Sequence, residues 1–82
     1  MKIYVVVEES RNPYSGQKGH MSFDNKSDAL DHAIDVAKGY NGFGDKVKLN
    51  SIYEVDLDNK GVVEMTLVMF NGSFELKHKG SE

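Results

Sequence analysis

The fold of this 82-residue chain is decided by the stretch VVEMTLVMFNGSFELK, residues 62–77. Its centre is Asn71-Gly72, a pair that two-residue hairpin turns favour because both positions take positive φ angles. The stretch predicts antiparallel strands at 62–70 and 73–77. Alternation along the first strand separates its side chains onto two sheet faces. One face receives Val63, Met65, Leu67 and Met69, and the other receives Glu64, Thr66, Val68 and Phe70.

Upstream of this hairpin, the pattern predicts one strand and one helix. The strand covers 48–57, and the turn at 58–61 joins it to the hairpin. The helix begins after a cap at Asn25 or Ser27 and stops at Gly39. Its inward face is predicted from four apolar residues at helical spacing, namely Leu30, Ala33, Ile34 and Ala37.

The amino-terminal part predicts a further hairpin. Residues 2–9 are dense in β-branched side chains and form a strand, Pro13 and Gly16 mark a turn, and a weaker strand covers 18–23. The chain is therefore one α+β domain over residues 1–82, with a frayed tail at about 78–82. Its order is β-β-α-β-β-β, with a single antiparallel sheet of about five strands and one amphipathic helix packed on one face. The second face is partly apolar, so the helix leaves apolar surface uncovered.

Composition narrows the possible partners and compartments. The formal net charge is −3, and there is no cysteine. Binding to phosphate backbones requires a positive surface, so we expect no direct nucleic-acid partner and favour a basic protein surface. The apolar run at 3–7 ends at Glu8-Glu9 and is too short for a signal peptide or a membrane span. We expect a cytoplasmic protein of a bacterium or of a virus-infected cell, with no membrane partner.

No motif predicts catalysis, a cofactor or a metal. Gly39, Gly42 and Gly44 follow a helix, whereas a phosphate-binding loop precedes one. A calcium loop starting at residue 56 would need an oxygen ligand at 60 and an acid at 67, where lysine and leucine stand. The three histidines lack the spacing of a metal-ligand pair, and His32 is expected to pair with Asp28 or Asp35 along the helix. We therefore expect no enzyme activity.

Two groups of residues are candidates for partner binding. The first lies in loops and combines arginine with aromatic residues, which are frequent in interface hot spots; its members are Arg11, Tyr14, Tyr40 and Phe43. The second is an acidic stripe on the helix, formed by Asp28, Asp31 and Asp35, which could imitate nucleic-acid phosphate or dock on a basic groove. Plain turn loops and a solvated outer helix face are the alternatives.

Three segments carry a resemblance. They are the leading MKIYVVV, the phrase from Phe23 through SDAL at 27–30, and IYEVDLD at 52–58 before a glycine turn. In these the chain resembles the short accessory proteins of tailed bacteriophages. The resemblance implies a protein that binds and blocks a host enzyme or a defence complex, as anti-CRISPR and anti-restriction proteins do.

These considerations predict a non-catalytic protein-binding module that inhibits or modulates a host protein by direct contact. One alternative is a homodimeric structural module that pairs through the face carrying Val68 and Phe70 or through the edge of the last strand. Another is a small domain that binds a ligand or nucleotide through the glycine loop.

Overall fold

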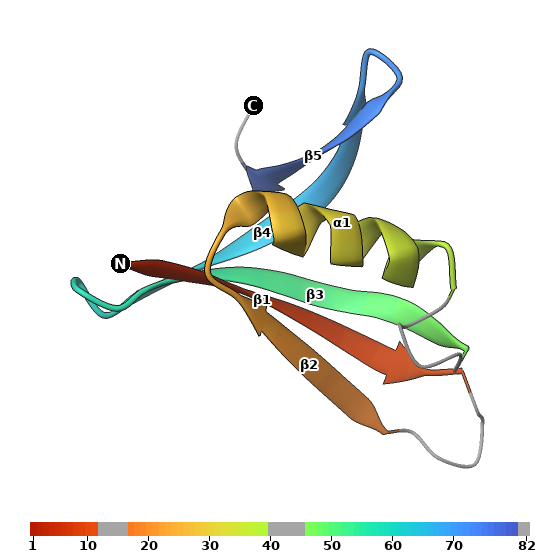
Figure 1. Ribbon diagram of the computed structural model, residues 1–82, viewed down its shortest axis with the longest axis horizontal. Helices are drawn as coiled ribbons and strands as arrows, with labels where there is room; N and C mark the ends of the chain where they lie inside the picture. Colours follow the sequence, from red (N-terminus) through yellow and green to blue (C-terminus); the bar gives the residue numbers. More distant parts are fainter. Residues whose placement is uncertain (12–16, 40–45, 81–82) are drawn as a thin grey trace.

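Five strands and one helix make up the part of the chain that the computed structural model describes, residues 1–11, 17–39 and 46–80. They follow one another as β1 (Lys2–Ser10), β2 (Lys18–Phe23), α1 (Lys26–Ala37), β3 (Val47–Asp56), β4 (Gly61–Phe70) and β5 (Ser73–His78). The strands form one antiparallel sheet in the order β2-β1-β3-β4-β5, and α1 packs against it (Figure 1). The predicted α+β class and element order are confirmed.

The β3–β4 and β4–β5 turns have identifiable causes. Asn71 and Gly72 have φ angles of 52° and 80°, as the predicted two-residue hairpin requires. In the β3–β4 turn, Asp56 accepts hydrogen bonds from the backbone N–H groups of Asp58 and Asn59 at 3.1 and 3.2 Å. The Asn59 side chain also donates to Asp56 at 2.9 Å, and this bond is the main reason why the pKa of Asp56 lies below its usual value. Asp56 therefore organises a hairpin turn.

The sequence predicts a frayed tail from about residue 78, but the ordered chain continues past this point. His78 belongs to β5, and the backbone N–H of Lys79 still donates to the carbonyl of Glu64 at 2.9 Å. This bond extends the β4–β5 ladder past Lys77. Pairing with β4 therefore orders a polar segment that its composition alone marks as loose.

Helix α1 is capped by Asn25, whose side chain accepts from the backbone N–H of Asp28 at 2.8 Å. It ends at Ala37, and the positive φ of Gly39, 108°, turns the chain away as predicted. The predicted inward face is partly wrong. The buried residues are Ala29, Ala33 and Val36, whereas Ala37 is exposed. Small alanines bring the helix backbone close to the sheet, and the larger Leu30 and Ile34 lie half-buried at the flanks of the contact.

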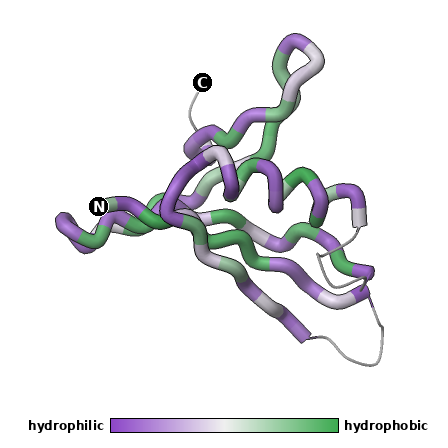
Figure 2. The backbone as a smooth tube through the Cα atoms, viewed as in Figure 1, coloured by the Kyte–Doolittle hydropathy of each residue, from purple (hydrophilic) through white to green (hydrophobic). Residues whose placement is uncertain are grey.

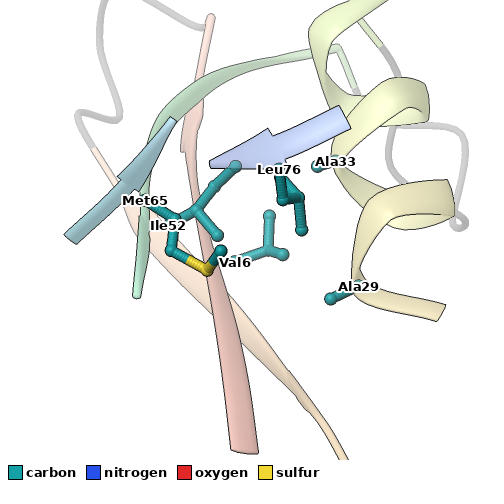
Figure 3. Packing of buried hydrophobic residues seen from close by; sticks show 6 residues of the cluster. All are labelled: Val6, Ala29, Ala33, Ile52, Met65 and Leu76. Atoms are coloured by element: carbon teal, nitrogen blue, oxygen red, sulfur yellow. The ribbon is translucent and has the colours of Figure 1, made fainter. Parts of the chain in front are cut away.

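The core lies between α1 and one sheet face. Side chains of four neighbouring strands meet two helix alanines there (Figure 3); the cluster consists of Val6, Ile52, Met65, Leu76, Ala29 and Ala33. Cross-strand register sets Ile52 opposite both Val6 and Met65. Met65 lies on the helix side, so the predicted alternation in β4 is confirmed, and the face with Val63, Met65, Leu67 and Met69 is the one toward α1.

The sheet divides beyond Ile52 and Met65. β3 and β4 pair only over 52–56 and 61–65, whereas β1 pairs along the whole of β3. A cavity of about 150 Å³ opens where the two strands diverge, between Leu49 and Leu67 among others. The β4–β5 hairpin therefore projects from the rest of the sheet (Figure 1).

Candidate protein-interaction surface

The sheet face turned away from α1 carries a continuous apolar strip, which we call the open face. Because Val6, Ile52 and Met65 point toward the helix, their neighbours in each strand point away from it. The open face consists of Ile3, Val5, Val7, Tyr53, Val55 and Val62. Cross-strand register joins most of these residues directly, since Val5 opposes Tyr53, and Val55 opposes both Ile3 and Val62. Val7 continues the strip along β1, two positions after Val5 on the same face.

Exposure and charge make this strip a candidate interaction surface. Val62 is 64% exposed, and the other five residues are half-buried by their neighbours. Hydrophobic positions recur along β1 and β3 in Figure 2. Charged pairs border the strip, with Glu9 and Lys48 at 3.6 Å and Glu64 and Lys79 at 3.0 Å. An apolar centre with a polar rim is the usual anatomy of a protein–protein contact.

The acidic stripe lies on the other side of the molecule. Asp28, Asp31 and Asp35 are all exposed on α1, so they face solvent away from the sheet. The carboxylate of Asp28 already accepts a hydrogen bond from the Asn25 side chain at 2.8 Å as part of the helix cap. The stripe and the open face are therefore separate surfaces, which one flat partner does not reach together.

The candidate loop residues are only partly described. Arg11 is exposed, but its Nε donates to the carbonyl of Val47 at 3.0 Å and its backbone N–H donates to that of Lys46 at 3.1 Å. These hydrogen bonds connect the end of β1 to the start of β3, so Arg11 has a structural role. Tyr14, Tyr40 and Phe43 lie outside the described residues.

His32 contacts a residue that the sequence did not single out. Its Nε2 lies 3.7 Å from a carboxylate oxygen of Glu8 in β1, and its ring centroid lies 5.4 Å from that of Phe23. The predicted pairing with Asp28 or Asp35 is replaced by this contact, because His32 lies on the sheet-facing flank of α1. Both side chains of the pair are only 11% exposed. The pair therefore contributes to the packing of α1 on β1.

A second polar cluster gathers around Glu54, whose side chain is 11% exposed on the helix side of β3. Lys2 approaches it at 3.5 Å and His78 at 3.3 Å, and Tyr4, directly opposite in register, hydrogen-bonds to it. Desolvation raises the pKa of Tyr4, and the charge of Glu54 and this hydrogen bond raise it further. The cluster joins the ends of β1, β3 and β5.

The raised pKa of Tyr4 predicts an alkaline loss of stability. The folded state keeps the phenol protonated more firmly than the unfolded state, whose tyrosines titrate near pH 10. The free energy of unfolding is thus unaffected by this group below that pH and falls as pH rises through the folded pKa. We expect Tyr4→Phe to show a shallower decline in urea titrations between pH 8 and 11.5. Tyr53→Phe, on the open face, is the matched control, and equal slopes in Tyr4→Phe and wild type would contradict the assignment.

Comparison of the sequence and structure with protein-family models, curated proteins and solved structures gives no match. No functional residue is therefore transferred from another protein. Within residues 1–11, 17–39 and 46–80, no group of histidine and acidic side chains is arranged to hold a metal ion. The same residues include no helix with the length and apolarity needed to cross a membrane.

Proposed function

We propose that this chain is a non-catalytic protein-binding module that inhibits or modulates a host protein or complex by contact through its open face. The observation that supports the proposal is the continuous apolar strip of Ile3, Val5, Val7, Tyr53, Val55 and Val62 on the sheet face opposite the one that packs against α1. Contiguous exposed apolar surface on a small domain marks interaction sites.

The charge and chemistry of the open face indicate what kind of partner surface would fit it. Tyr53 lies at the centre of the strip, opposite Val5 and Glu64, and tyrosine is enriched among residues that dominate binding energies. The partner surface would be an apolar patch with a charged margin. The net charge of −3 speeds association with a basic protein. The resemblance to bacteriophage accessory proteins suggests a host enzyme or a defence complex as the source of that surface.

The polar clusters favour binding over catalysis. The Glu8–His32 pair lies under α1, and Glu54 is occupied by Lys2, Tyr4 and His78. Both clusters join elements of the fold to one another. These contacts give the titratable side chains a structural role in the fold.

The test is a pull-down from lysate of the source cell or its viral host, comparing two variants of β4. Val62 and Met69 are both 64% exposed but lie on opposite sheet faces. Val62→Asp would bury an unpaired charge at the interface, so we expect a stoichiometric partner to bind at least about 30-fold more weakly. Met69→Asp is expected to retain that partner. Circular dichroism checks that both variants are folded.

Two outcomes would overturn the proposal. Equal capture by Val62→Asp and wild type would eliminate the open face as the binding surface. Loss of capture in an Asp31→Asn, Asp35→Asn double variant, with Val62→Asp unaffected, would assign binding to the acidic stripe of α1 instead.

A further inference from the structure

Strand β5 lies at one end of the sheet that the described residues form. Within the described residues, its only strand neighbour is β4. The bond from Lys79 N–H to the Glu64 carbonyl fixes which residues of β5 point inward, because bonded pairs alternate along an antiparallel ladder. Glu75 and Lys77 therefore bond to β4, and the backbone groups of Phe74, Leu76 and His78 point outward. Such an edge is a template for another strand.

The sequence of β5 is complementary to itself. When two β5 strands run antiparallel about a two-fold axis at Leu76, each Leu76 opposes the other, and Phe74 opposes His78 of the second copy. These residues carry the outward backbone groups, so each opposed pair exchanges both of its hydrogen bonds. Glu75 then opposes Lys77 of the second copy at the non-hydrogen-bonded positions, where side chains approach most closely. Geometry and charge therefore select the same register.

The space beside β5 has room for the apolar side chains of such a strand. A groove of about 470 Å³ lies between the first turn of α1 and β5; its lining is Lys26, Ser27, Leu30, Glu75, Leu76 and Lys77. Leu30 and Leu76 supply the apolar part of this lining. In the register above, Leu76 and Phe74 of the second copy project on the helix side and fill the groove.

The opposite edge of the sheet lacks this complementarity. Strand β2 has the sequence KGHMSF, with Lys18 and His20 but no acidic residue. Antiparallel pairing of two β2 strands therefore creates no pair of opposite charges. In β5, Glu75 and Lys77 form an ion pair at 4.0 Å within one chain. When two copies pair, each of these side chains also lies opposite the oppositely charged side chain of the second copy.

We infer that two copies of this chain associate edge to edge through β5, antiparallel about a two-fold axis at Leu76. The resulting continuous sheet has ten strands, twice the five of one copy. Its axis is perpendicular to the sheet, so both helices lie on one side and both open faces on the other. This association does not depend on what the open face binds.

Charge reversal tests the register directly. Lys77→Glu sets two glutamates against each other at both symmetric positions, so we expect the dimer dissociation constant to rise at least about tenfold. The double variant Glu75→Lys, Lys77→Glu restores opposite charges and should return within about threefold of wild type. Sedimentation velocity measures the shift between one and two copies of the 9.2 kDa chain. All substituted side chains are exposed, and Lys18→Glu on β2 is the matched control.

Each result has a defined meaning. Dimeric wild type, a dissociated Lys77→Glu variant and a restored double variant support β5 pairing. A wild type that stays monomeric at about 100 μM would overturn the inference, since cellular pairing at lower concentration would then be negligible. A dimer that dissociates in Lys18→Glu but not in Lys77→Glu would also overturn it, because pairing would then occur through the other edge.

Discussion

Ile52→Ala is expected to lower the free energy of unfolding by about 3 kcal/mol. Ile52 is 1% exposed and lies opposite both Val6 and Met65, under the alanines of α1. Ladder hydrogen bonds hold β1 and β4 on either side, so the neighbours cannot close the cavity that the smaller side chain leaves. A chain of this length has a total stability of roughly 4–12 kcal/mol. The substitution therefore removes a large share of the total.

Urea denaturation followed by circular dichroism measures this loss. Val55→Ala is the control in the same strand, because Val55 lies half-buried on the open face. Its expected cost is about 1 kcal/mol, since less apolar surface is withdrawn from water there. Equal losses in the two variants would mean that the hydrophobic core is not concentrated between the sheet and α1.

Ala33→Leu should also be strongly destabilising, by about 2–3 kcal/mol. Ala33 is fully buried at the contact between α1 and the sheet, so a larger side chain forces the helix away from Val6 and Ile52. Ala37→Leu is the matched substitution at an exposed position of the same helix and should change stability by no more than about 0.5 kcal/mol. Thermal melts of both variants provide the comparison. A larger loss of stability in Ala37→Leu than in Ala33→Leu would mean that Ala37, and not Ala33, lies in the helix–sheet contact.

The contrast between Ala33 and Ala37 shows where sequence patterns succeed and where they are ambiguous. Period-two alternation in β4 correctly separated Met65 from Glu64, because each side chain alternates by local backbone geometry. In α1 six of the nine non-acidic positions are apolar, so two overlapping stripes fit helical spacing. The stripe that includes Ala29 and Val36 is the one that packs against the sheet, because small residues permit the closest approach of helix and sheet.

Long-range features were beyond the reach of local patterns. The order β2-β1-β3-β4-β5 depends on pairing between β1 and β3, which no local motif encodes. The open face was anticipated as partly apolar surface carrying Val68 and Phe70, whereas its centre lies on β1 and β3. Glu8 and Glu54 were missed as well. The signal available for Glu8 was an acid directly after the apolar run at 3–7, and its partner His32 lies 24 residues later on a different element.

The central ladder of the sheet also has a consequence for the synthesis of the chain. Residues of β1 pair with residues of β3 that lie 37 to 54 positions later. At translation rates of about 5–20 residues per second, β1 waits roughly 2–10 s for its partner to be made. Its valines are then covered on one edge by β2 alone. The step that completes the sheet is the pairing of β1 with β3, two strands that lie far apart in the sequence, and such long-range steps slow folding. The nascent chain is therefore most exposed to aggregation and to chaperone binding in the seconds before β3 leaves the ribosome.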